Sequence, residues 1–179
     1  YHILLCLRAH GWTRNLPEKN HVANKSDDWF EESFRFVLPG YNVRPLEMSG
    51  AIGIEQLKKL PSFIDKRREN AEVFIKLFKN DDRFIIQKEI GESSWFGFSL
   101  IINDKSISRK SVIKLLGENN IDCRPIVTGN FTRNDVMKYF NYSIHNNLDN
   151  ADKLHDHGLF VGNSHADLTK ELHYLKRIL

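Results

Sequence analysis

The spacing of apolar and polar residues predicts helices in the first half of the chain. A short apolar run from His2 to Ala9 indicates a helix that stops at Gly11. Another helix is expected from Leu46 to Lys59, and a separate one from Pro61, because proline suits the first turn of a helix. The 46–59 segment is apolar on several faces, so we expect it to be buried against a second domain or a second subunit. On the helix after it, Lys66–Glu69 is most simply a face exposed to solvent.

After Arg83, short β-rich runs alternate with helical patterns. Ser108 suits the N-cap of a helix that continues through Asn119, and leucines at helical spacing after Asp167 predict the last helix. The order β-β-α-β-α-β-α predicts an α/β fold in which helices pack on a small, largely antiparallel sheet. The expected strands cover residues 84–86, 95–102, 121–124 and 159–162.

The same pattern predicts how the chain is organised. Polar, irregular sequence from Trp12 to Asp28 indicates a long loop, and Phe34 and Phe36 alternate with polar residues as in an extended segment. We therefore expect two parts. Residues 1–60 would hold the loop and the interface helix, and residues 61–179 would form a small C-terminal α/β domain.

Composition narrows the class of protein. Hydrophobic residues make up 41% and charged residues 27% of the chain, as in a globular domain. The net charge is +3 and no basic run occurs, so nucleic acid is not an expected partner. There is no secretory signal and no apolar stretch long enough to cross a bilayer, so we expect a cytoplasmic protein without a membrane partner. Cys6 and Cys123 lie among apolar residues, which favours buried, reduced thiols over reactive ones.

Three clusters of polar residues could bind a phosphorylated or sugar ligand. Gly40–Pro45 combines an asparagine and an arginine in a turn before a helix, where backbone amides attract an anion; a plain turn fits equally well. Cys123–Phe131 contains an arginine at a strand end and a flexible Gly129–Asn130 pair, although an ordinary exit from a strand explains it as well. The loop His10–Asn15 would either clamp a nucleotide or lie at the surface.

Other kinds of site find little support. His155 and His157 are two residues apart on an expected helix and so point apart, and neither they nor His165 have an acidic partner at ligand spacing. We therefore expect no metal site. The sequence motifs of α/β-hydrolases, P-loop NTPases, zinc proteases and dinucleotide-binding domains are absent.

Several motifs, taken in order, resemble the DegT/StrS family of sugar aminotransferases and dehydratases. The resemblance covers essentially the whole chain and implies the C-terminal half of a fold type I pyridoxal-phosphate enzyme, with residues 1–60 as the end of its large domain. The motifs are Leu7-Arg8-Ala9-His10-Gly11, Gly40-Tyr41-Asn42-Val43-Arg44, Ala51-Ile52-Gly53-Ile54-Glu55-Gln56-Leu57, Lys66-Arg67-Arg68 and Gly158-Leu159-Phe160-Val161-Gly162-Asn163.

Residues 8–17 and 123–131 resemble, more specifically, the 3-dehydratases of this family that act in colitose and O-antigen biosynthesis. This resemblance implies a pyridoxal or pyridoxamine 5'-phosphate cofactor, glutamate as amino donor and a GDP-linked 4-keto-6-deoxy sugar that loses its 3-hydroxyl. It also implies a homodimer whose active sites borrow residues from the partner, or docking onto the N-terminal half.

The resemblance assigns roles residue by residue. Asn42 would reach the cofactor phosphate of the partner subunit, and Arg124 would face the nucleotide sugar. Arg14 and Phe34 are further candidates for substrate contact. In the family the residue that moves protons lies upstream of the position matching Tyr1, so we assign no catalytic residue and expect the chain to be a fragment.

Two alternatives remain open at this point. One is a sugar aminotransferase of the same fold, such as a perosamine synthase, which an upstream lysine in place of histidine would indicate. The other is a truncated chain that has no catalytic activity and only associates with a partner.

Overall fold

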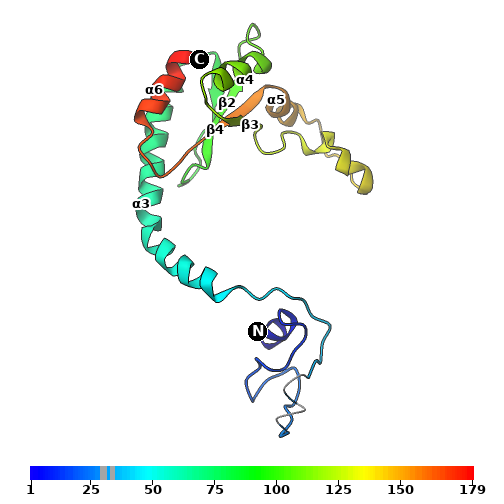
Figure 1. Cartoon of the computed structure of the whole chain (residues 1–179). Helices are drawn as coiled ribbons and strands as arrows, with labels where there is room; N and C mark the ends of the chain where they lie inside the picture. The colour runs from blue at the N-terminus through cyan, green and yellow to red at the C-terminus, as the bar shows by residue number, and fades with distance from the viewer. Residues whose placement is uncertain (29–31, 33–34) are drawn as a thin grey trace. The chain divides into compact units, whose positions relative to one another are not determined.

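The computed structural model, which describes residues 1–28, 32 and 35–179, contains one helix where the sequence predicts two. Helix α3 runs without a break from Glu47 to Phe78, and Pro61 lies inside it (Figure 1). Proline removes one backbone hydrogen bond from a helix but keeps a helical φ. The strong helix formers that precede it, Glu55–Leu60, favour continuation of the helix. The predicted break at Pro61 is therefore wrong.

The chain divides into two compact units, Tyr1–Lys58 and Lys59–Leu179. The first unit begins with α1 (His2–Leu7), which the sequence pattern predicts, and continues in irregular segments. Two antiparallel bridges hold those segments together, one between Ala9 and Asn42 and one between Trp12 and Phe36. Although α3 has 32 residues, neither it nor any other helix in the described part of the chain could cross a bilayer.

The second unit is built on a four-stranded sheet with the strand order β1-β2-β4-β3, in which every pair is antiparallel. The order of its elements along the chain is the predicted β-β-α-β-α-β-α, with two short 3-10 helices after β3. The elements are β1 (Phe84–Ile86), β2 (Gly97–Ile102), α4 (Arg109–Glu118), β3 (Cys123–Arg124), η1 (Phe131–Arg133), η2 (Asp135–Tyr139), α5 (Asp149–His157), β4 (Gly158–Gly162) and α6 (Thr169–Ile178).

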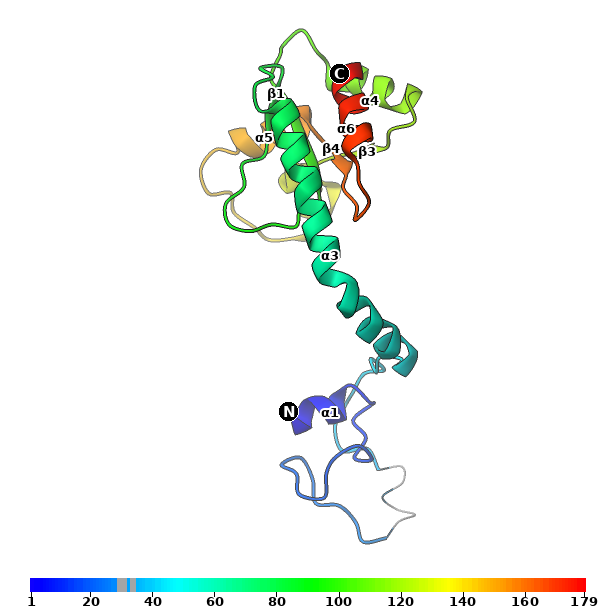
Figure 2. The same ribbon diagram turned by 90° about the vertical axis from the view of Figure 1, so that its left-hand side faces the viewer.

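One hydrophobic core holds this unit together. It lies between one face of the sheet and the helices α3, α4 and α6, and α6 runs beside the C-terminal half of α3 (Figures 1 and 2). Phe74 is fully buried and stacks on Phe78 and Phe98 at ring-centroid distances of 4.9 and 4.7 Å. The buried members of the core are Ala71, Phe74, Phe78, Phe84, Trp95, Phe98, Leu100, Ile102, Val112, Leu116, Leu159, Val161, Leu172 and Leu175.

Arg67 does not lie free on the solvent-exposed face of α3 that the sequence suggests. Arg67 donates hydrogen bonds to the carbonyl oxygens of Ser94, at 2.8 Å, Asn163, at 3.2 Å, and Trp95. Arg68 donates to the carbonyl oxygen of Ser93 at 3.1 Å. A helical period shows only that these side chains share a face, whereas the loops that come to meet that face are distant in sequence. The predicted solvated face is therefore wrong for Arg67, whereas the side chain of Arg68 remains 39% exposed.

Candidate functional site

Two of the sequence motifs come together in the first unit, where they fix the backbone around Asn42. The Tyr41 N–H donates to the Leu7 carbonyl at 2.6 Å, and the His10 N–H donates to the Tyr41 carbonyl at 3.0 Å. The Val43 N–H donates to the Arg8 carbonyl at 3.1 Å. These bonds join the end of α1 and the residues after it to the segment that carries Asn42, so the position of Asn42 is set by residues more than thirty places earlier in the sequence.

Glycine is required at two places in this pairing. Gly11 has φ +83°, and a Cβ there would lie 1.6 Å from the Leu38 carbonyl oxygen. A Cβ on Gly40 would lie 2.1 Å from the Gly11 nitrogen and 2.8 Å from the Leu7 carbonyl oxygen. Backbone atoms cannot rotate out of the way as a side chain can. The two glycines therefore allow the close approach that places Asn42.

The side chain of Asn42 meets the requirements of an anion contact. It is exposed, and its amide makes no hydrogen bond with the described residues, so the N–H groups are free to donate to a phosphate oxygen. The expected help from a helix N-terminus is not present, because α3 begins only at Glu47, whose carboxylate lies in the first turn. A cofactor phosphate would therefore be met by the side-chain amide, on a backbone held by hydrogen bonds at Tyr41 and Val43, and not by a helix end.

Arg14 lies in the same unit. Its guanidinium sits over the Trp12 indole, 5.1 Å from the ring centroid, and the indole stacks on Phe36 with ring centroids 5.7 Å apart. Thr13 between them is fully buried and donates its hydroxyl to the Arg35 carbonyl at 3.3 Å, which anchors the loop. Arg14 is exposed and supported on an aromatic face, a position suited to contact with a ligand. Phe34 lies outside the described residues.

Arg124 belongs to the second unit. It ends β3, where its backbone pairs with Phe160 of β4, and its side chain is exposed. The Gly129–Asn130 pair that follows is not the flexible element that the sequence suggests. Asn130 is 4% exposed and bonded through its side chain to Asp152 at 2.8 Å. The sequence gives no sign of this contact, because Asp152 is distant along the chain.

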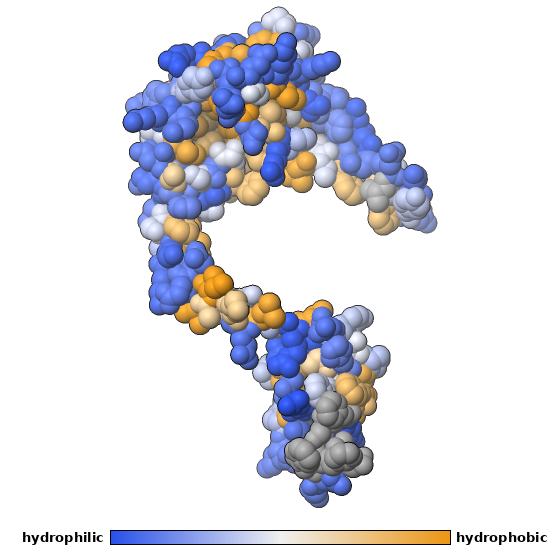
Figure 3. Space-filling model, in the orientation of Figure 1, coloured by the Kyte–Doolittle hydropathy of each residue, from blue (hydrophilic) through white to orange (hydrophobic). Residues whose placement is uncertain are grey.

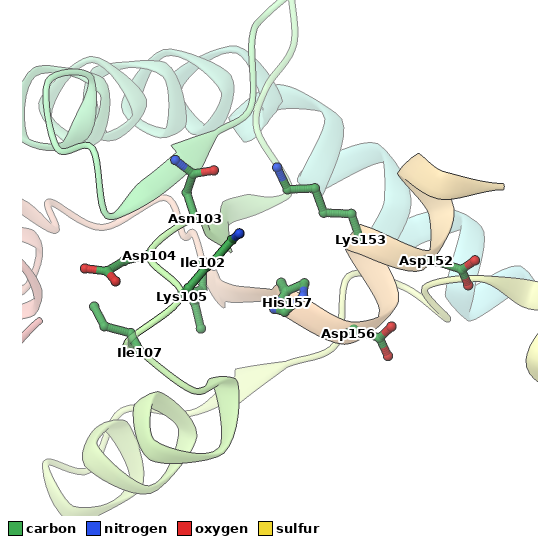
Figure 4. Close-up of a pocket in the computed structure, with 9 residues that line it drawn as sticks. All are labelled: Ile102, Asn103, Asp104, Lys105, Ile107, Asp152, Lys153, Asp156 and His157. Carbon is green, nitrogen blue, oxygen red and sulfur yellow. The ribbon is translucent and has the colours of Figure 1, made fainter.

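A cavity of about 410 Å³ lies between α5 and the loop after β2 (Figure 4). Its three acidic groups serve other contacts: Asp156 accepts from Arg133 at 2.9 Å, Asp152 accepts from Asn130, and Asp104 accepts from Ser106. Figure 4 shows the carboxylates of Asp152 and Asp156 pointing away from Asn103 and Lys105. The cavity lining is Ile102, Asn103, Asp104, Lys105, Ile107, Asp152, Lys153, Asp156 and His157. We assign no ligand to it.

His155 and the two cysteines have structural contacts. Within the described residues, no three histidine, cysteine or acidic side chains come close enough to hold a metal ion. The ring nitrogen Nδ1 of His155 lies 3.3 Å from the backbone N–H of Asn130 and accepts from it. Burial raises the pKa of the Cys6 and Cys123 thiols, which keeps both in the unreactive protonated form at neutral pH.

Comparison with known proteins gives a consistent result. The model of the DegT/DnrJ/EryC1/StrS aminotransferase family matches residues 1–174. The chain is 64% identical over 182 residues to a GDP-4-keto-6-deoxy-D-mannose 3-dehydratase of Escherichia coli O55:H7, covering 100% of this chain and 47% of the relative. It is 61% identical over 182 residues to the enzyme of the same name from Yersinia pseudotuberculosis, covering 100% of this chain and 46% of that relative.

A solved structure of the E. coli enzyme with bound hydrated PLP superimposes with a TM-score of 0.91. The identity is 64%, and the match covers 100% of this chain and 47% of that one. The predicted fold class, the C-terminal part of a fold type I pyridoxal-phosphate enzyme, is confirmed by this match. The chain thus spans about half the length of the curated relatives it matches.

Proposed function

This chain belongs to the DegT/DnrJ/EryC1/StrS aminotransferase family, and from that premise we propose that it forms part of a pyridoxal-phosphate-dependent 3-dehydratase. The substrate would be a GDP-linked 4-keto-6-deoxy sugar, which loses its 3-hydroxyl with glutamate as amino donor, as a step in deoxysugar biosynthesis. The observation that carries the proposal is the 64% identity to the E. coli dehydratase along the whole of this chain. Because the chain spans about half of that relative, the activity belongs to the complete enzyme.

In that enzyme the residues of this chain bind and orient. The Asn42 amide would donate to the cofactor phosphate held by the partner subunit, a charge-assisted bond from a rigid backbone. Bound pyridoxal phosphate supplies the electron sink of the reaction. The sequence resemblance and an exposed place at the end of β3 support Arg124 as a contact of the nucleotide sugar. An arginine can hold a diphosphate oxygen with two parallel N–H donors.

Arg14 and Phe34 complete the proposed substrate contacts. The guanidinium of Arg14 is held over Trp12, so little side-chain freedom would be lost when it meets an anionic or sugar group. No group of this chain is assigned to proton transfer. Its contribution to catalysis would be positioning and charge neutralisation. A cytoplasmic location belongs to the same proposal, since both cysteines are free, as in a reducing compartment.

The first turns of α3 support association with a partner, either a second copy or an N-terminal half. Apolar side chains gather there at the surface (Figure 3). Their exposed fractions are far above those of ordinary core residues: Leu46 72%, Met48 73%, Ile52 57%, Ile54 61% and Leu57 65%. A contiguous apolar surface of this kind marks an interface. We propose that this segment packs in the homodimer.

A chimera tests the proposed function. The part of the E. coli dehydratase that matches this chain would be replaced by residues 1–179, and turnover of the GDP-linked sugar and of its dTDP-linked counterpart would be measured. We expect the chimera to keep dehydratase activity and the preference for GDP. A chimera that folds and binds cofactor but does not process the GDP-linked sugar would reject the proposal.

A further inference from the structure

The loop after Arg124 contains a strained turn. The Gly129 N–H closes it by donating to the Ile126 carbonyl at 2.9 Å. Within the turn Val127 has φ +50°, a conformation that β-branched residues rarely adopt. Val127 is also 84% exposed, so burial of its own side chain does not compensate for the strain. Such a conformation persists only where the surroundings hold it, and it is found preferentially at ligand contacts.

Asn130 ties the end of this turn to α5. Its side-chain Nδ2 donates to Asp152 Oδ1 at 2.8 Å. Its Oδ1 accepts from the N–H and the hydroxyl of Thr132 at 3.0 and 2.7 Å. Its backbone N–H donates to His155 Nδ1 at 3.3 Å. Asn130 is buried and both polar atoms of its side chain make hydrogen bonds. A substitution that removes one of these bonds should therefore alter the conformation of the turn.

Gly129 itself lies directly against α5. A Cβ on Gly129 would lie 2.7 Å from His155 Nδ1 and 2.8 Å from the His155 Cα. On the other side, Arg109 donates to the carbonyl oxygens of His155 and of Gly158, the latter at 3.3 Å, and so fixes the junction of α5 and β4. Helix and strand together form a rigid support beneath the turn.

The ion pairs that Arg133 makes with α5 stabilise the turn less than the hydrogen bonds of Asn130 do. Arg133 reaches Asp156 at 2.9 Å and Asp152 at 3.5 Å, but all three side chains are over two-fifths exposed. Exposed pairs of this kind are weakened by water and salt. The Asn130–Asp152 hydrogen bond, whose donor Asn130 is only 4% exposed, is therefore the main polar anchor. A cavity of about 350 Å³ beside the turn is lined by Val127, Thr128 and Gly129 together with Arg109, Leu154 and His155 of the support, which leaves space for a ligand.

We propose that Asn130 is a positioning residue that holds Arg124 to Val127 in the conformation required for contact with the nucleotide sugar. It acts through Asp152 and His155 of α5 and does not touch the substrate. This inference rests on the proposed function, because the ligand of the loop is the sugar nucleotide of that reaction.

The test exchanges the asparagine and the aspartate of the Asn130–Asp152 hydrogen bond, in the complete enzyme. Asn130→Asp replaces the donor that faces Asp152 with a carboxylate, so two carboxylates repel each other while the acceptor for Thr132 remains. We expect the KM for the GDP-linked sugar to rise at least about tenfold, with kcat within about threefold, because substrate binding is lost before chemistry is affected. Adding Asp152→Asn restores a donor and an acceptor with exchanged roles, and KM should return to within about threefold of wild type.

Asn147→Asp is the matched control. Asn147 donates to Asp149 at 2.7 Å, the same kind of pair, but it is exposed and bonds to no residue of the turn. Its kinetics should equal those of wild type. Thr132→Val, a milder change that removes only the hydroxyl bond to Asn130, should raise KM by about threefold and provides the answer if Asn130→Asp does not fold.

The outcomes separate the two proposals. An active wild type whose KM is unchanged by Asn130→Asp, or by Thr132→Val, overturns the positioning role and leaves the proposed function intact. If KM rises in Asn130→Asp and is not restored by adding Asp152→Asn, the claim that Asn130 acts through Asp152 is also overturned. A wild-type enzyme that binds cofactor but does not process the sugar overturns the proposed function, and with it this inference.

Discussion

Gly40→Ala should separate the two backbone segments that place Asn42. The added Cβ would lie 2.1 Å from the Gly11 nitrogen and 2.4 Å from the His10 carbonyl carbon, whereas unstrained contacts are about 3.5 Å long. The segments must therefore part by roughly 1 Å. Three backbone hydrogen bonds join them: Tyr41 to Leu7, His10 to Tyr41 and Val43 to Arg8. At about 0.5–1.5 kcal/mol each, their loss costs about 1.5–4.5 kcal/mol.

The assay has two parts, both made on the complete enzyme. Amide hydrogen exchange at Tyr41 and Val43 should accelerate in Gly40→Ala, and the displaced Asn42 should weaken cofactor binding by about 5- to 150-fold, which corresponds to about 1–3 kcal/mol. Gly117→Ala is the control, because a Cβ there meets no atom within 4 Å and alanine favours a helix by about 1 kcal/mol. Unchanged exchange and cofactor affinity in Gly40→Ala would refute the argument that this close approach places Asn42.

Three further predictions follow from single side chains. Asn42→Ala should weaken cofactor binding by about 1–3 kcal/mol without lowering unfolding free energy, since its amide makes no bond with the described residues; an unchanged cofactor titration would reject its role. Gly53→Arg should convert the proposed dimer to monomers in sedimentation without disturbing the chain itself, because no atom outside its own helical turn lies within 4 Å of the added Cβ. A mutant that stays folded and dimeric would show that this face is not the interface. Hydrogen bonds from Arg83, and then from Lys176, hold the pKa of Asp81 well below its usual range, so Asp81→Asn should cost about 1–3 kcal/mol at neutral pH. A folded-state pKa that is lowered gives stability above the unfolded pKa, near ~3.9, and loses it as pH falls further, so the wild-type advantage should shrink below about pH 4; an advantage independent of pH would contradict this.

The sequence predicts much of the second unit, because the alternation and helical spacing of its apolar residues are local signals. The strands from Phe84 to Gly162 and the cap at Ser108 follow those signals, and Ser108 accepts from the Ser111 N–H at 3.0 Å as a cap should. The local spacing of apolar residues does not predict that α3 continues through Pro61. Local propensity around a proline favours either outcome, and only the surrounding helix formers favour continuation.

Contacts between distant segments explain the other differences. Arg67 looks like a surface residue until the loops around Trp95 and Asn163 reach it. Asn130 looks like part of a flexible turn until α5 supplies Asp152 and His155. Resemblance to a family, and not periodicity, identifies the candidate site residues Asn42, Arg14, Arg124 and Phe34. A side chain that contacts a ligand carries no periodic signal of its own. Their roles stay predictions.

The identity of the product tests the central claim most directly. The complete enzyme containing this chain would be incubated with pyridoxal phosphate, glutamate and GDP-4-keto-6-deoxymannose, and the sugar nucleotide analysed by mass spectrometry and proton NMR. We expect a GDP-linked sugar that has lost its 3-hydroxyl and carries a methylene at carbon 3. A sugar that keeps the 3-hydroxyl and gains an amino group at carbon 4 would contradict it and identify the enzyme as an aminotransferase.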